Sequence, residues 1–141
     1  MTRLLAVDYG AKRLGVAISD PTRTIASPLT TLVRRTGKRP PWAELVRLID
    51  ENEIAELIVG LPLDLSGDEG AWAAEVREFG GELTRRTGLP VHWVDERLTS
   101  VQAERAVRGS GLKRSDREDK SRVDAAAAAL ILQAYLQRTQ G

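Results

Sequence analysis

The chain has 141 residues, of which 42% are hydrophobic and 29% charged, so we expect a single domain with one hydrophobic core over residues 1–141. This length excludes a two-domain enzyme with its own cofactor-binding half. The chain has no cysteine and one histidine, His92, which excludes disulfides, thiolate nucleophiles, Cys-ligated metals and His-rich metal sites. A bound metal would therefore rest on carboxylate ligands, which Mg²⁺ and Mn²⁺ prefer.

The charge is unevenly distributed, although the net charge is only +1. Residues 1–50 and 101–141 are basic, with net charges of +5 and +3, whereas residues 51–100 carry −7. Basic flanks around an acidic middle would suit a protein that binds a polyanion around metal ions. Ordinary solvated helix faces give the same pattern, and on charge alone we prefer that interpretation. No signal-peptide-like start and no apolar run of membrane-spanning length is present, so the sequence predicts a cytoplasmic protein.

The first third of the chain predicts three strands. Apolar runs over residues 4–8 and 15–19, joined by a short polar turn, are typical of a hairpin. Residues 24–32 are rich in β-branched and apolar side chains and include Pro28, which lacks a backbone N–H. Because such a residue is tolerated at a sheet edge, we expect this third strand at or near the edge.

Helices and strands then alternate. The pattern predicts a helix from Pro41 with an apolar face through Ile49, a strand over 56–60, and a second helix that has an apolar side from Trp72 to Leu83 and is ended by Gly88 and Pro90. It then predicts a strand over 90–95, a helix from Thr99 to about Gly109, a polar basic loop over 111–121, and a final helix from about Arg122 to Gln137. This order indicates an α/β protein with a mixed five-stranded sheet and helices on both faces.

Acidic residues stand at the predicted ends of these elements. Asp8 ends the first strand, and Asp95 and Glu96 end the last. Adjacent strand residues point to opposite faces, so at most one of Asp95 and Glu96 shares a site with Asp8. Asp124 is expected in the first turn of the final helix, before five alanines. Taken singly, Asp8 is equally well explained as a turn residue, and the helix dipole is sufficient to explain Asp124.

The combination is more informative than each acid alone. An alanine-rich helix can approach a sheet closely, so the three acids are candidates to converge. Carboxylates within a few ångströms of each other repel unless divalent cations lie between them. Two such cations suit phosphodiester hydrolysis, because one activates the attacking water and the other stabilises the leaving oxygen. The pattern therefore favours a metal-dependent nuclease.

The sequence resembles the YqgF or RuvX proteins, which have an RNase H-like fold and are related to RuvC-type Holliday-junction resolvases. The resemblance spans nearly the whole chain and rests on Ala6-Val7-Asp8-Tyr9-Gly10 with Lys12-Arg13 and Gly15-Val16-Ala17-Ile18-Ser19-Asp20, on Val59-Gly60-Leu61-Pro62-Leu63, on Asp95-Glu96-Arg97-Leu98-Thr99-Ser100, and on Lys120 with Val123-Asp124-Ala125-Ala126-Ala127. It implies that Asp8, Glu96 and Asp124 are the catalytic and metal-binding residues, with Asp95 a weaker candidate, and that the cofactor is a pair of Mg²⁺ or Mn²⁺ ions.

The sequence departs from the families that it resembles in two places. The loop after Pro62 usually begins with an Asn in the YqgF or RuvX proteins, whereas this chain has Asp64. RuvC-type resolvases present two acids near the start of the final helix, whereas only Asp124 stands here. We therefore expect weaker binding of the full metal pair.

Basic residues near these acids are candidates to hold a phosphate backbone. They are Lys12, Arg13, Arg97, Lys113, Arg114, Lys120 and Arg122. The alternative is that they are ordinary solvated side chains. His92 shares strand parity with Glu96 and could approach the site, but a structural role is favoured over acid–base chemistry.

The resemblance implies two substrates, four-way DNA junctions and the 5′ end of the small-subunit (16S) ribosomal RNA precursor, and the sequence does not choose between recombination and rRNA processing. Symmetric nicking of a junction would require two active sites and hence a homodimer. The alternative function is a non-catalytic nucleic-acid-binding factor that assists ribosome maturation or transcription. The three acids argue against it, because negative charge that faces phosphates weakens binding.

Overall fold

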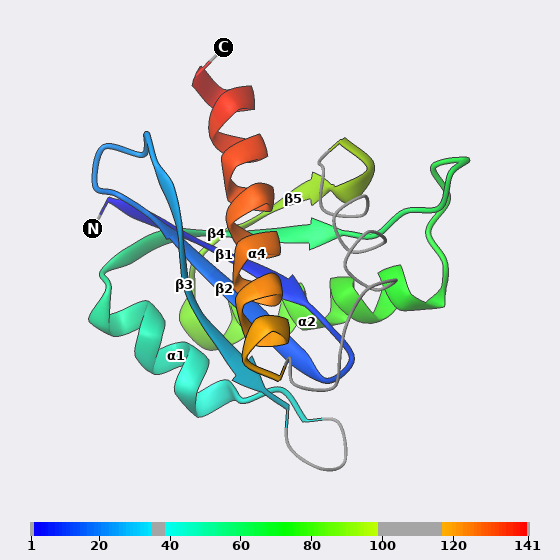
Figure 1. The fold of residues 1–141 in the computed structure, drawn as a ribbon, viewed down its shortest axis with the longest axis horizontal. Coiled ribbons are helices and arrows are strands. Elements are labelled where there is room, and N and C mark those ends of the chain that lie inside the picture. The colour runs from blue at the N-terminus through cyan, green and yellow to red at the C-terminus, as the bar shows by residue number, and fades with distance from the viewer. Residues whose placement is uncertain (1, 35–38, 99–116, 141) are drawn as a thin grey trace.

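The computed structural model describes residues 2–34, 39–98 and 117–140. In these ranges five strands form one sheet, in the spatial order β3-β2-β1-β4-β5 (Figure 1). The strands are β1 (Arg3–Tyr9), β2 (Arg13–Ser19), β3 (Ala26–Val33), β4 (Ile54–Leu61) and β5 (Val91–Asp95). Strands β1, β2 and β3 form an antiparallel meander, whereas β4 and β5 run parallel to β1. The predicted mixed five-stranded sheet is confirmed.

The position of each strand in the sheet follows from its residues. The central strands β1 and β4 are almost entirely apolar and buried on both faces, as strands covered by helices must be. Strand β3 is mostly exposed or half-buried and lies at the edge. Its Pro28 is paired with Ala17 beside a register shift, where one backbone donor fewer is tolerated.

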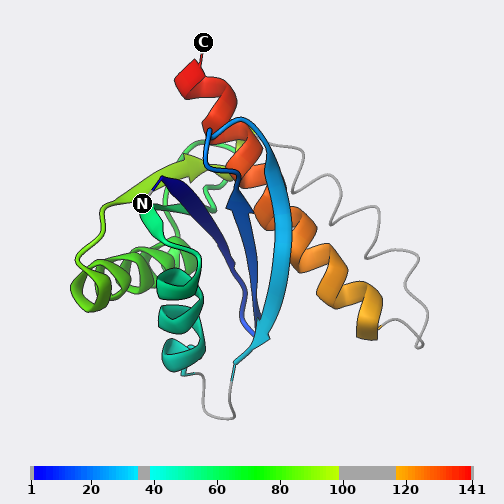
Figure 2. The ribbon, with the colours of Figure 1, turned by 90° about the vertical axis from the view of Figure 1, so that its left-hand side faces the viewer.

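Helices cover both faces of the sheet. Figure 2 shows α1 (Trp42–Glu51) and α2 (Ala71–Thr87) on one side and α4 (Arg117–Gln140) on the other. A short 3-10 helix, η1 (Glu96–Leu98), follows β5 directly. In the part of the chain that the structure describes, no helix combines the length and apolar character that crossing a membrane requires.

The two faces have cores of different composition. The α1/α2 face is filled by large side chains such as Leu57, Phe79 and Leu83. On the α4 face, strand residues Ala6 and Ala17 pack against alanines of the helix, among them Ala128. Small side chains on both surfaces allow the backbone of α4 to lie close to the backbone of the sheet.

The final helix begins earlier than the sequence predicts. Helix α4 starts at Arg117, so residues 117–121, which were predicted to belong to the loop over 111–121, are helical. The physical reason is that residues 117–122 contain neither glycine nor proline, and their Arg, Glu and Lys residues are good helix formers. Asp124 therefore lies about two turns inside the helix, and the prediction that it occupies the first turn is wrong. The predicted helix from Thr99 to Gly109 lies outside the described residues.

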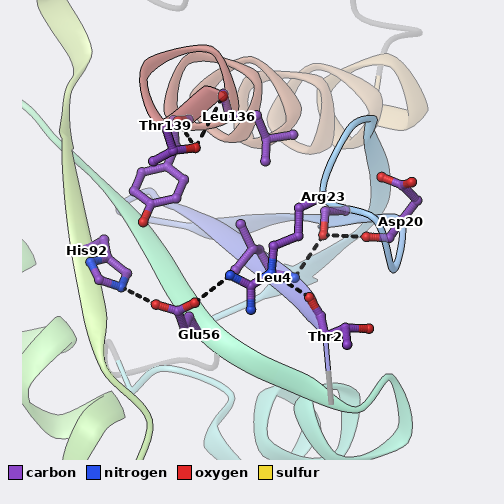
Figure 3. A network of polar contacts seen from close by, with 10 residues as sticks. Thr2, Leu4, Asp20, Arg23, Glu56, His92, Leu136 and Thr139 are labelled. Atoms are coloured by element: carbon purple, nitrogen blue, oxygen red, sulfur yellow. Dashed lines mark hydrogen bonds and ion pairs between the residues drawn. The ribbon is translucent and has the colours of Figure 1, made fainter. Parts of the chain in front are cut away.

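A polar network ties together the end of the sheet where β1 begins (Figure 3). Glu56 on β4 accepts a hydrogen bond from Arg23 at 2.7 Å and lies 2.7 Å from His92 Nε2 on β5. The Arg23 side chain also donates to the carbonyl of Thr2. These contacts lower the pKa of Glu56 below its ordinary value of 4.5, with the hydrogen bond to His92 as the largest cause.

The network makes stability depend on pH. Because its folded-state pKa is lowered, Glu56 stabilises the fold above its ordinary pKa of 4.5, and this contribution is lost as the pH falls through the lowered value. We therefore expect Glu56→Gln to be less stable than wild type at neutral pH, with the difference shrinking in acid. Urea unfolding of both proteins over a pH series measures this. The exposed Glu78 supplies the control Glu78→Gln. A gap between Glu56→Gln and wild type that stays constant into acid would contradict the expectation.

Candidate active site

Asp8 lies between two glycines on the α4 face of the sheet. Its partner in β2 is Gly15. On the β4 side Val7 pairs with Val59, so Asp8, the next residue of β1, lies beside Gly60, the next residue of β4. Paired residues point to the same face, and neighbouring strands are about 4.8 Å apart. The Asp8 side chain, only 3% exposed, is thus flanked by positions without side chains.

Glu96 lies over the second of these glycines. It is the first residue of η1, directly after β5, and is 4% exposed. A Cβ atom placed on Gly60 would lie 2.8 Å from Glu96 Oε1 and 2.6 Å from Ile131 Cδ1 of α4. The carboxylate of Glu96 therefore occupies the α4 face above β4, the strand next to that of Asp8. Two buried carboxylates share one side of the sheet at the ends of their strands.

Asp124 is placed at the same edge by backbone contact. A Cβ atom on Gly15 would overlap the carbonyl group of Asp124, so α4 rests directly on β2 beside Asp8. The Asp124 carboxylate accepts a hydrogen bond from Arg13 Nε at 2.6 Å, and the two side chains are 22% and 31% exposed. Glu96 thus lies over Gly60 and the Asp124 backbone lies over Gly15, the two residues that flank Asp8 in the sheet.

The donor set suits a hard divalent cation. Three carboxylates belong to this edge, two of them buried, and glycine on both sides of Asp8 lets Glu96 and the backbone of Asp124 approach the sheet closely. Within the described ranges no three Asp, Glu or His side chains are already arranged to hold a metal ion. The Asp124 carboxylate is instead bound by Arg13.

Asp95 belongs to the other side of the sheet rim. Val91 and Trp93, which share its strand parity, pack against the α1/α2 core. Its carboxylate accepts hydrogen bonds from the backbone N–H and the guanidinium of Arg97, the closest at 2.7 Å. The hydrogen bond from the Arg97 side chain is the largest cause of a pKa below the ordinary value for Asp95. Of the two adjacent acids, only Glu96 lies on the face of Asp8.

Asp64 orders the loop that follows β4 by accepting hydrogen bonds within it. Its Oδ1 accepts hydrogen bonds from the Ser66 N–H and hydroxyl and from the Asp68 N–H, at 2.6 to 3.0 Å. The hydrogen bond from the Ser66 side chain is the largest cause of the lowered pKa of Asp64. Such a turn orders the loop locally, and Arg97 packs against Gly67 within it.

The predicted phosphate-binding residues have varied surroundings. Lys12 is exposed in the turn between β1 and β2, whereas the guanidinium groups of Arg13 and Arg97 are held by Asp124 and Asp95. Lys113 and Arg114 lie outside the described residues, and the described part of α4 includes the backbone but not the side chains of Lys120 and Arg122.

His92 does not lie at the candidate active site with Glu96. It shares strand parity with Glu96 but lies four residues earlier, about 13 Å away along the strand. There it contacts Glu56 and packs against the ring of Tyr135, with 5.4 Å between the ring centroids (Figure 3). Its contacts are those of a structural residue.

Sequence reasoning overlooked the two glycines that shape this edge. A glycine inside an otherwise apolar strand indicates a close approach of another backbone or group. The predicted strands 15–19 and 56–60 begin and end at Gly15 and Gly60, whereas β2 and β4 extend past both residues and place them inside strands. Their meaning depends on register, which only the structure supplies.

Comparison with known proteins places this chain in a family. The RuvX family, described as "Holliday junction resolvase", matches residues 2–138. A protein of Koribacter versatilis named "Putative pre-16S rRNA nuclease" is 46% identical over 136 residues, covering 96% of this chain and 87% of the relative. A protein of Maridesulfovibrio salexigens with the same name is 39% identical, covering 96% of this chain and 98% of the relative.

The fold comparison agrees with the RNase H-like fold that the resemblance implied. The structure of Thermus thermophilus RuvC in complex with a Holliday junction substrate superposes with a TM-score of 0.58 at 18% identity, covering 100% of this chain and 97% of RuvC. At that identity the likeness shows the fold alone. The match over nearly the full length, together with relatives above 30% identity, shows that the chain belongs to the RuvX family of nucleases.

Proposed function

We propose that this chain is a divalent-metal-dependent endonuclease that hydrolyses phosphodiester bonds of structured nucleic acid, with Asp8, Glu96 and Asp124 as metal ligands. The observation that carries the proposal is the placement of Asp8 and Glu96, two buried carboxylates on one sheet face, with the backbone of Asp124 against the same edge. A cation or proton shared between neighbouring buried carboxylates relieves their mutual repulsion.

The chain's own residues have distinct tasks in this function. Asp8, at the end of the rigid central strand β1, and Glu96 hold Mg²⁺ or Mn²⁺, and the ions when bound supply an activated water and charge stabilisation for the leaving oxygen. Asp124 completes the ligand set from α4. Lys12, exposed beside this edge, contacts the phosphate backbone without reading base sequence.

Precursor 16S ribosomal RNA is the substrate that the comparisons favour. The relatives at 39% and 46% identity carry that substrate in their names, whereas the RuvC likeness at 18% identity supports a common fold. A four-way DNA junction is the competing substrate and the one in the family description. Its symmetric resolution would require two copies of the site in a homodimer.

The test is a cleavage assay with three substrates: an RNA carrying the 5′ extension of the 16S precursor, a four-way DNA junction, and plain duplex DNA. Each is incubated with Mg²⁺, Mn²⁺ or a chelator. We expect cleavage of the precursor RNA with either ion and none with chelator. Cleavage that persists in chelator would refute the metal mechanism. Tight binding of all substrates without cleavage under any condition would indicate the non-catalytic binding factor instead.

A further inference from the structure

The Arg13–Asp124 ion pair stands where a metal ligand is expected. Asp124 Oδ2 and Arg13 Nε are 2.6 Å apart, a short charge-assisted hydrogen bond. The helix dipole does not account for the position of this carboxylate, because its effect falls off within the first turn and Asp124 lies two turns inside α4. The positive charge that neutralises Asp124 in this structure is therefore the guanidinium of Arg13.

Arg13 is the partner that can move without a change in the backbone. The backbone of Asp124 rests against Gly15, so α4 cannot shift closer to the sheet at this residue. Arg13 begins β2 two residues before Gly15 and has the same strand parity. Its side chain is long, is 31% exposed and reaches solvent, so it can leave Asp124 without movement of the backbone.

We propose that Arg13 is a built-in competitor for the metal: it holds the Asp124 carboxylate in the metal-free protein and is displaced when a divalent cation binds. This inference rests on the proposed function, in which Asp124 is a metal ligand. The guanidinium places a positive charge against Asp124 Oδ2, so a cation that binds this carboxylate must work against charge repulsion or displace Arg13. Metal loading consequently releases a positively charged side chain beside the site, where it can contact a phosphate.

The test measures Mn²⁺ affinity by titration calorimetry without nucleic acid, for wild type, Arg13→Gln and Arg13→Lys. We expect Arg13→Gln to bind Mn²⁺ about two- to fivefold more tightly than wild type, the range expected when a partly exposed ion pair no longer competes. Arg13→Lys keeps a competing charge and should lie between them. The matched control is Arg77→Gln, which breaks the exposed ion pair between Arg77 on α2 and Glu69 in the loop before it and should leave the affinity unchanged.

Thermal unfolding provides a second readout that must agree. In chelator, Arg13→Gln should unfold at a lower temperature than wild type, and saturating Mn²⁺ should remove most of that difference, because the ion pair is already broken in the loaded protein. If either variant folds too poorly for calorimetry, the same comparison is made with the other variant and wild type.

Three results would overturn the inference. Weaker Mn²⁺ binding by Arg13→Gln would mean that Arg13 positions Asp124 for the metal. Unchanged affinity with lowered stability in both chelator and Mn²⁺ would mean that the ion pair is only structural. Absence of Mn²⁺ binding by wild type would refute the proposed metal dependence and this inference with it, whereas the first two results leave the proposed function intact.

Discussion

Asp8→Asn is expected to reduce the cleavage rate about 1,000-fold or more, because loss of a metal ligand removes several kcal/mol of transition-state stabilisation and each 1.36 kcal/mol is a factor of ten. Asparagine keeps the shape of the buried side chain but removes its negative charge. Stability should be unchanged or slightly higher, because a neutral amide costs less to bury than a carboxylate. Rates on the precursor RNA in Mg²⁺ and Mn²⁺, together with the unfolding temperature, measure both effects.

The matched control for this change is Asp95→Asn. Asp95 is an acid at the same sheet rim, but it lies on the opposite face and is held by Arg97. We expect its loss to change the cleavage rate by less than about tenfold, because no metal ligand is removed. A loss as large as that of Asp8→Asn would mean that the face assignment of the metal ligands is wrong. Full activity of Asp8→Asn would exclude Asp8 as a ligand.

Alanine at the two glycines beside Asp8 is expected to have separable effects. At Gly15 the new Cβ meets the backbone of Asp124, which cannot yield locally, so Gly15→Ala should destabilise the protein by about 1–3 kcal/mol or more and displace α4. At Gly60 it meets the ends of the Glu96 and Ile131 side chains, which can move. Gly60→Ala should therefore cost less stability but lower activity about 100-fold, by displacing Glu96.

Gly81→Ala is the control for both substitutions. Gly81 lies in α2, and nothing beyond the helix's own backbone and its chain neighbours lies within 4 Å of its Cβ position, so alanine there should stabilise the protein by about 0.5–1 kcal/mol and leave cleavage unchanged. Denaturant unfolding and cleavage rates of the three variants test this ordering. Equal stability losses at Gly15 and Gly60 would contradict the idea that backbone contact at Gly15 is what places α4.

Within the described residues, the order of strands and long helices and the class of sheet could be predicted because they depend on local periodicity. Alternating apolar runs and the helical face that begins at Trp42 are properties of short segments, and each segment forms its element for reasons contained within it. Pro28 indicated an edge strand in the same way, since the missing N–H is a property of the residue itself. The start of α4 was mispredicted because a charged helical segment and a polar loop have similar composition over six residues.

The identity of the candidate acids was readable from the chain, since Asp8, Glu96 and Asp124 stand in segments that resemble the RuvX proteins. Their surroundings were not. Strand parity predicted that only one of Asp95 and Glu96 shares the face of Asp8, but not which one. The flanking of Asp8 by Gly15 and Gly60 and the pairing of Arg13 with Asp124 join residues up to 111 positions apart. Strand register and helix docking decide which distant residues meet, and these arise from burial of whole faces, so they become visible only when the elements have packed.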